Sequence, residues 1–534
     1  MAEPVGECSQ GGSSASSSAA EVPSLGAVEL KSEALESGCR DRVSFSQEVC
    51  SIPGDGISER SLAMASSLGG KNIGWFGSMA LMVNNITGPG MLHLARVFQQ
   101  AGVVVPTVAF LVVCCTSTAC ATLLCDAIAR LPGNANVDRR CEYSDIFNHF
   151  IPGSFMFSQI VFYMAIFSQT VSSIVGTAQS MDGLIVEAVG RNWGLSVVGG
   201  DYDNLSWVTW TPEYHCGQLK HKSECVPFKS FNGAPDVGEV ITLGYVLTLA
   251  ILAPFGCMNL DDNIKFQVFS FFVLLVISVI FLIDMICQRG LDPSLVPLFG
   301  DSYSTVLGMI MFNFAYCPTI PSWLNEKRRD VPVAPVLYGS AAGATLMYLL
   351  IGLVSAMAYQ HPGGNILQTL SAGHTWVFAK VSSFLFGILV VGLGIPVFCI
   401  VMRYNLLVGG VCGSRMATIM GVVLPWSVSW LLYQGKAAEV FINLSGVCTV
   451  SLVSFVGPLF VAAAATGLSM RGMRLVSFLR QMWARVPLHQ TSCPALPSRW
   501  LHLQRRYVFV LFLLMVPMII AGLALELTDL AGFS

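Results

Sequence analysis

Long apolar segments separated by short polar ones run from about residue 70 to the end of this chain. A helix needs about 20 apolar residues to cross a membrane, and a window of that length finds about eleven spans. They cover residues 74–99, 103–130, 152–188, 239–257, 265–287, 303–323, 334–358, 376–402, 415–433, 438–467 and 507–526. The pattern predicts an all-α membrane protein, because helices satisfy their backbone hydrogen bonds without water.

The first span is interrupted at its centre by residues that break helices. They are Asn84, Asn85, Thr87, Gly88, Pro89 and Gly90. An unpaired backbone group costs roughly several kcal/mol in hydrocarbon, so a break persists only where the freed groups find a partner. In secondary transporters that partner is a solute or ion held between half-helices. A second break, 314–318, lies in the sixth span, and the pair favours a secondary transporter.

Composition separates the membrane domain from the N-terminal segment. Hydrophobic residues make up 54% of the 534 residues and charged residues 11%, whereas soluble proteins carry about 25% charged residues. Residues 1–70 are rich in Ser, Gly and Ala and are expected to form a disordered cytosolic tail. The transmembrane transporter domain would then cover 71–534. No motif indicates a metal site, a cofactor or a nucleic-acid partner.

The placement of basic residues predicts the orientation. With a cytosolic N-terminus, the cytosolic loops hold most of the Lys and Arg residues, and an odd number of spans leaves the C-terminus extracytosolic. The basic stretch 468–506 is then a cytosolic loop, and 190–238 is an extracytosolic loop. We expect glycosylation at Asn204 in that loop, and a disulfide between Cys216 and Cys225, with two free thiols as the alternative.

The two breaks suit a small zwitterion. Its carboxylate needs free N–H groups at a positive helix end, and its ammonium group needs carbonyl oxygens. Glycine lets the backbone approach a ligand, and proline removes a donor. The predicted substrate-binding residues are Asn84, Asn85, Thr87, Gly88, Pro89, Gly90, Met91, Phe312, Phe314, Ala315, Tyr316 and Cys317. The alternative is a Gly/Pro kink that neighbouring helices stabilise.

Three motifs together resemble the amino acid/auxin permease family of the amino acid–polyamine–organocation superfamily. They are Asn84-x-x-x-Gly88 followed by QQAG, FAYCPTIPSWLNEKR in the sixth span, and GLGIPVFCIVMRYNLL in the eighth. The resemblance implies a LeuT-like fold, in which spans one to five and six to ten form a 5+5 inverted repeat with broken helices 1 and 6. It also implies transport of amino acids coupled to sodium or protons, or exchange.

The same resemblance places a coupling-ion site at Asn84, Thr87, Gly392 and Gly394. Sodium-coupled members carry a hydroxyl residue shortly before the proline of the eighth-span motif. Here Gly392 and Gly394 precede Pro396, which favours proton coupling or exchange over sodium. Arg96 is a candidate outer-gate residue that would pair with Glu439, with snorkelling to the interface as the alternative. His93 is a candidate proton relay, with ordinary packing as the alternative.

The sequence therefore predicts a secondary active transporter of amino acids, with neutral ones favoured, that works by alternating access. Its partners would be the amino acid, H+ or Na+, and the lipids of a plasma or lysosomal/vacuolar membrane. One rival is an amino-acid sensor that signals through the cytosolic tail. Another is a membrane-embedded acyltransferase, which needs a convergent set of His and Asp or Asn residues. His93 has no such companion, so we expect no enzyme.

Overall fold

The structure is a computed structural model. It describes residues 70–198, 206–212, 227–228, 239–360, 366–372, 376–433, 437–467 and 498–532. The expected tail, the sequon at Asn204, the cysteines Cys216 and Cys225, and most of the basic loop lie outside the described residues, so those expectations stay predictions. The end of the predicted basic loop is helical, since α21 begins at Ser498.

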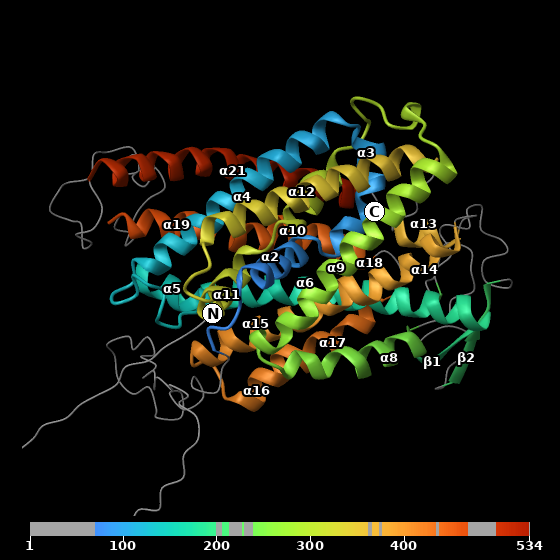
Figure 1. Ribbon diagram of the computed structural model, residues 1–534, viewed down its shortest axis with the longest axis horizontal. Coiled ribbons are helices and arrows are strands. Elements are labelled where there is room, and N and C mark those ends of the chain that lie inside the picture. The colour runs from blue at the N-terminus through green and yellow to red at the C-terminus, as the bar shows by residue number, and fades with distance from the viewer. Residues whose placement is uncertain are drawn as a thin grey trace, which may run out of the picture. The chain divides into compact units, whose positions relative to one another are not determined.

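Most described residues are helical, and eight described helices are long and apolar enough to cross a membrane (Figure 1). They are Val104–Ala129, Phe155–Val189, Leu260–Arg289, Val333–Ala358, Val377–Val408, Ser414–Leu432, Val440–Ala465 and Leu503–Thr528. A shorter apolar helix covers Leu243–Cys257. The predicted first and sixth spans are not continuous helices. The all-α membrane class is thus confirmed, with spans close to those predicted.

Some of these spans are single helices, and others combine consecutive helical elements. The uninterrupted ones are α4 (Val104–Ala129), α6 (Phe155–Val189), α12 (Val333–Ala358) and α21 (Ser498–Gly532). The composite ones are α8 and η3 (Leu243–Leu252, Ala253–Cys257), α9 and η4 (Leu260–Ile283, Asp284–Arg289), α14, η7 and α15 (Val377–Leu385, Phe386–Val391, Gly392–Val408), α16, η8, α17 and η9 (Ser414–Thr418, Ile419–Val423, Leu424–Ser429, Trp430–Leu432), and α18, η10, η11 and α19 (Ala437–Ser445, Gly446–Val450, Leu452–Val456, Gly457–Ala465). Short helices α5 (Tyr143–Phe150), α13 (Ile366–Ala372) and η5 (Pro293–Leu295) lie between spans.

Burial divides the spans into central and peripheral ones. The most apolar stretch of Val377–Val408 is 78% buried, and that of Phe155–Val189 is 72% buried. By contrast, Leu503–Thr528 is 28% buried and Leu260–Arg289 is 33% buried, and their exposed side chains are largely apolar. A broad apolar surface is unfavourable in water but matches lipid. The peripheral helices therefore present lipid-facing surfaces around a packed centre.

The predicted extracytosolic loop contains a small sheet that the sequence did not predict. Strands β1 (Asn192–Val198), β2 (Ser206–Trp210) and β3 (Glu239–Thr242) form an antiparallel sheet in the order β2-β1-β3. Asn192 pairs with Trp210, and Gly194 pairs with Thr242. Below it, the Asp182 carboxylate accepts hydrogen bonds from Asn192 Nδ2 at 2.6 Å and from the Gly244 amide at 2.8 Å. The sheet is thereby tied to the ends of α6 and α8.

The two broken spans lie among the longer helices (Figure 1). The first consists of α2 (Trp75–Ile86), η1 (Pro89–His93) and α3 (Leu94–Ala101), and α2 packs against α9 and α12. The second consists of α10 (Ser304–Asn313), η6 (Cys317–Thr319) and α11 (Ile320–Glu326). Helix α10 packs against η1, so the two breaks lie close to each other.

Candidate functional site

The first break begins where α2 ends at Ile86. The Thr87 hydroxyl donates to the Val83 carbonyl at 2.8 Å, and the Gly88 amide donates to the Ile86 carbonyl at 2.8 Å. Pro89, at the start of η1, has no amide hydrogen, so the α-helical ladder cannot continue through it. Because the Thr87 hydroxyl is used within its own helix, its proton is not available to a ligand.

The second break leaves backbone carbonyls that side chains from other helices satisfy. Helix α10 ends at Asn313, and η6 resumes at Cys317. Ser117 Oγ on α4 donates to the Phe314 carbonyl at 3.0 Å, and Gln169 Nε2 on α6 donates to the Ala315 carbonyl at 3.4 Å. Such partners are what a non-helical segment at membrane depth requires.

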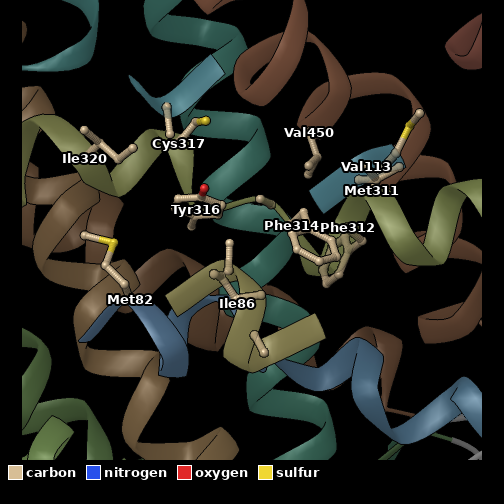
Figure 2. Packing of buried hydrophobic residues seen from close by; sticks show 14 of the residues in the cluster. Met82, Ile86, Val113, Met311, Phe312, Phe314, Tyr316, Cys317, Ile320 and Val450 are labelled. Carbon is tan, nitrogen blue, oxygen red and sulfur yellow. The ribbon is translucent and has the colours of Figure 1, made fainter. Parts of the chain in front are cut away.

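The two breaks contact each other directly. Asn85 Nδ2 donates to Thr319 Oγ1 at 3.1 Å, which joins α2 to the end of η6. The Asn313 side chain lies against Gly90, since a Cβ added there would stand 2.0 Å from Asn313 Oδ1. Figure 2 shows Ile86 of α2 facing the aromatic residues of the second break. Gly90 is therefore required for this close approach.

Buried polar atoms without a partner border the two breaks. Among the described residues, Asn313 Oδ1 and Nδ2, Asn84 Oδ1, Gln169 Oε1 and Ser172 Oγ are buried and accept or donate no hydrogen bond. Such an atom costs about 1–3 kcal/mol, so a cluster of them indicates a ligand or water. A Cβ added at Gly88 would meet no heavy atom within 4 Å, which marks open space beside the first break. Polar atoms and open space are what a binding site for a small polar solute needs.

An amide network joins α2, α9 and α15. Asn84 Nδ2 donates to the backbone carbonyl of Gln267 at 2.8 Å and to its Oε1 at 3.0 Å. Gln267 Nε2 in turn donates to the Leu393 carbonyl at 2.7 Å and to Asn263 Oδ1 at 3.0 Å. The sequence prediction missed Gln267 and Asn263. The polarity of Gln267 within the apolar fifth span was a signal that could have identified it, whereas Asn263 lies just before the predicted start of that span.

The predicted aromatic residues mainly pack the centre of the protein. Phe312, Phe314 and Tyr316 are at most 2% exposed. The Phe314 ring lies 6.0 Å from Tyr348 and 6.3 Å from Phe110, centroid to centroid. The Tyr316 hydroxyl donates to Thr118 Oγ1 on α4 at 3.3 Å, so it is engaged away from the first break. Met91, Ala315 and Cys317 are likewise buried, and the side chain of Pro89 lies outside the described residues.

The remaining predicted residues lie on the first broken span, on α15 and on α18. Gly392 packs against α6, where an added Cβ would stand 3.0 Å from Thr177 Cγ2, whereas Gly394 faces open space. Arg96 is half-buried on α3, and His93 is half-buried at the end of η1. Glu439 belongs to α18, but its side chain lies outside the described residues. The pairing of Arg96 with Glu439 and the relay role of His93 therefore stay predictions.

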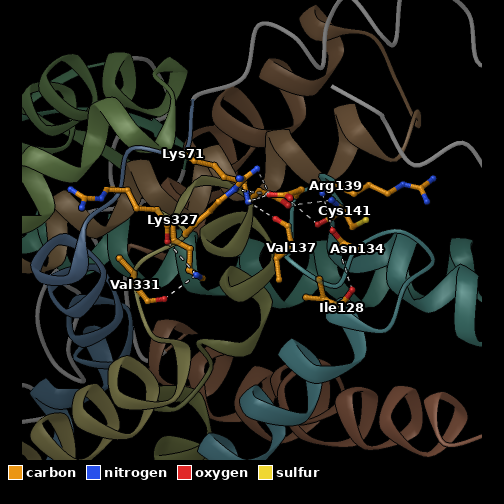
Figure 3. Close-up of polar contacts among 12 residues, drawn as sticks. Lys71, Ile128, Asn134, Val137, Arg139, Cys141, Lys327 and Val331 are labelled. Carbon is orange, nitrogen blue, oxygen red and sulfur yellow. Dashed lines mark hydrogen bonds and ion pairs between the residues drawn. The ribbon is translucent and has the colours of Figure 1, made fainter. Parts of the chain in front are cut away.

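The segment before α2 is fastened across the end of α11. Ile73 forms a parallel bridge with Lys327, its amide donates to the Glu326 carbonyl at 3.1 Å, and Trp323 Nε1 donates to Ser78 Oγ at 2.9 Å. Lys71 Nζ donates to the Val137 carbonyl (Figure 3). Asp138 pairs with Arg329 at 2.9 Å and, more loosely, with Lys71 at 3.8 Å. This strap (residues 71–78, including the first turn of α2) lies across the end of α11, on the side that the sequence predicts to be cytosolic.

The chain is similar to known transporters. Residues 71–208 match the model of a family described as transmembrane amino acid transporter protein. Over that stretch the match confirms the resemblance drawn from the motifs, and the matched family is one of transporters rather than enzymes. It gives no support to the amino-acid sensor. No curated protein matches the chain.

Similar solved structures include two of Mhp1. Its inward-facing conformation has a TM-score of 0.49 at 12% identity, over 87% of this chain and 92% of that one. The closed form of this nucleobase-cation-symport-1 family transporter, with bromovinylhydantoin bound, has a TM-score of 0.48 at 13% identity, over 86% and 91%. A mutant of the Eremococcus coleocola manganese transporter has a TM-score of 0.42 at 13% identity, over 85% and 94%.

Proposed function

We propose that this membrane protein is a secondary transporter of neutral amino acids. The observation that carries the proposal is the meeting of two broken spans around unpaired polar atoms and open space. Three of the unpaired atoms are side-chain carbonyl oxygens, on Asn84, Gln169 and Asn313. Carbonyl oxygens are suitable partners for an ammonium group, and the start of η1 at Pro89 offers a positive helix end to a carboxylate.

Substrates with a neutral side chain are favoured, because the two breaks carry no charged residue that could balance a charge on the substrate side chain. In the stretches 82–93 and 313–319, His93 is the only basic residue, and neither stretch contains an acidic residue. An unpaired charge inside the protein is costly, so a cationic or anionic side chain would lack compensation here. The amino and carboxyl groups of the substrate can instead compensate each other.

We propose proton coupling or exchange rather than sodium coupling. The Gln267 amide already bridges Asn84 on α2 and the Leu393 carbonyl on α15, where a coupling ion was expected. Gly392 and Gly394, on either side of Leu393, provide no hydroxyl oxygen for a sodium ion. The network is neutral and hydrogen-bonded, so it holds these helices together without a cation.

Alternating access would require the strap to detach from α11. The strap is held by the ion pair of Lys71 with Asp138, the backbone bridge of Ile73 with Lys327 and the hydrogen bond from Trp323 to Ser78. A surface ion pair contributes about 0–1 kcal/mol and a hydrogen bond about 0.5–1.5 kcal/mol, so thermal motion can open these contacts repeatedly. In a LeuT-like cycle the strap would open on one side while residues near α3 close on the other.

Uptake into proteoliposomes tests the proposal. A panel of radiolabelled amino acids is offered with an imposed proton gradient, an imposed sodium gradient, or substrate trapped inside for exchange. We expect neutral amino acids to enter with a proton gradient or by exchange, and Gly88→Val to abolish the flux. A strict need for sodium would refute the coupling proposal. The absence of flux for every amino acid, with folded protein, would refute transport of amino acids.

A further inference from the structure

Glu142 is a buried carboxyl group outside the membrane spans. It is the N-cap residue of α5, in the connection between α4 and α6, and it is 1% exposed. Glutamate is almost never fully buried unless it is paired. The burial of this carboxyl group therefore needs an explanation, which its hydrogen-bond partners provide.

The partners of Glu142 are neutral donors, and two of them belong to the second broken span. Ser322 Oγ donates to Glu142 Oε2 at 2.7 Å, and Asn325 Nδ2 donates to Glu142 Oε1 at 2.9 Å. The side chain also forms a capping box with Asp145. A buried carboxylate that receives only neutral hydrogen bonds is poorly compensated, so the protonated form is favoured.

The contact of Glu142 is part of the docking of α11. Asn325 Nδ2 donates to the Cys141 carbonyl at 3.1 Å, and the Cys141 amide donates to Asn325 Oδ1 at 3.2 Å. Helix α11 then ends at Glu326, whose carbonyl accepts from the strap residue Ile73. Helix α11 is thus held by Glu142 and Cys141 through its side chains and by the strap at its end.

Few charged groups surround this carboxyl. Arg140 precedes it in the loop, Asp145 lies on its own helix, and Glu326 and Lys327 lie at the end of α11. The facing parts of α15 and α6 contribute the uncharged Asn405 and Gln159, which hydrogen-bond each other at 3.0 Å. Burial raises the pKa of Glu142 to about 8, while the hydrogen bonds of Ser322 and Asn325 oppose this rise.

We propose that Glu142 is a proton-binding site that couples the docking of α11 to pH. The carboxyl holds its proton while α11 is docked and transfers it to water when α11 separates and the carboxylate becomes hydrated. Docking is therefore strongest at low pH and weakens as the pH rises. The link to transport rests on the proposed function, but the proton site itself does not.

The direction of the pH effect follows from the pKa of Glu142 in the docked and in the separated state. Docked Glu142 has its pKa raised to about 8, and hydrated Glu142 has the ordinary value of about 4.3. Docking is fully favoured below the ordinary value and is lost as the pH rises toward 8, by up to about tenfold per pH unit. Between pH 6.5 and 8.5 the separated fraction should increase about 20-fold.

Alkylation of Cys141 tests the proposal without any transport assay. The Cys141 side chain is 1% exposed, and its backbone is paired with Asn325. Purified full-length wild type and Glu142→Gln are treated with N-ethylmaleimide from pH 6.5 to 8.5, and modification of Cys141 is measured by peptide mass spectrometry. The wild-type rate is divided by the variant rate at each pH, which cancels the ionisation of the thiol.

We expect this ratio to rise about 20-fold with pH, because glutamine cannot ionise. A constant ratio would overturn the proposal. If Glu142→Gln does not fold, Ser322→Ala replaces it. That variant keeps the carboxyl group but removes one hydrogen-bond donor to the carboxylate, which raises the pKa of Glu142 further. The rise of Cys141 alkylation should then level off at a higher pH than in the wild type. An unchanged pH dependence would overturn the proposal. Because alkylation needs no substrate, a positive result stands even if amino acid uptake fails.

Discussion

Replacing Gly88 and Gly90 separately should distinguish a ligand site from a structural kink. Gly88 has φ −78° and ψ −164°, a conformation open to any residue, and an added Cβ meets no heavy atom within 4 Å. Gly88→Ala should therefore fold normally, with a stability change within about 0.5 kcal/mol. If the open space belongs to the substrate, the added methyl group overlaps it.

The size of the effect follows from overpacking. One extra methyl group forced into an occupied site costs about 1–3 kcal/mol. Since about 1.4 kcal/mol is a factor of ten, the apparent affinity for the amino acid should fall about 5- to 150-fold in Gly88→Ala. Gly88→Val, with two more methyl groups, should lose measurable transport. The assay is concentration-dependent uptake into proteoliposomes, with thermal unfolding measured in parallel.

Two other glycines provide the controls. Gly343, exposed on α12, also has no heavy atom within 4 Å of an added Cβ, so Gly343→Ala should preserve both folding and uptake. At Gly90 the added Cβ would lie 2.0 Å from Asn313 Oδ1, so Gly90→Ala should lower the melting temperature. Wild-type affinity in folded Gly88→Ala, or destabilisation equal to that of Gly90→Ala, would refute the assignment of this space to the substrate.

Three further predictions concern polar contacts. Asn313→Leu removes two unpaired buried atoms, so thermal unfolding should show unchanged or increased stability. Uptake should nevertheless fall at least about tenfold, because a charged group of the substrate loses its hydrogen bond. Gln267→Leu leaves the Leu393 carbonyl without its side-chain donor and should lower the free energy of unfolding by about 1–3 kcal/mol in a denaturant titration; an unchanged value would mean that the bridge adds no stability. Asp138→Asn removes half-exposed ion pairs of about 1 kcal/mol or less, so Cys141 alkylation at fixed pH should rise no more than about fivefold; a larger rise would make Asp138 the main closure.

The sequence predicted the breaks but not what they contact. Gly88, Pro89 and Pro318 have local consequences for the backbone, so their helix-breaking role can be read directly. The bridge between Asn84 and Gln267 joins residues 183 positions apart, and no local pattern specifies such a contact. Tyr316 was expected to bind the substrate, yet its hydroxyl donates to Thr118, because packing against α4 decides where that side chain lies.

The β-sheet was missed for a similar reason. Its middle strand pairs with β3 across the long segment between Val198 and Glu239, so the partner is not a nearby hairpin strand. A connection of this length is not a two-residue hairpin, so short turn signals do not identify the pairing of β1 with β3. The strands are also tied to the Asp182 carboxylate of α6, a tertiary contact that the local sequence of the strands does not specify.

The short helix α11 connects the candidate substrate site to the candidate proton site. Thr319, just before its first residue, accepts from Asn85 of the first break, and Ser322, three residues later, donates to Glu142. A helix rises about 1.5 Å per residue, so these two contacts are separated by less than one turn. Helix α11 has only seven residues, and we expect it to move as a unit. A ligand that shifts the contact of Asn85 with Thr319 should therefore shift Ser322 and Asn325 as well. Substrate binding at the breaks and protonation of Glu142 would then be coupled, because both change the same docking equilibrium of α11.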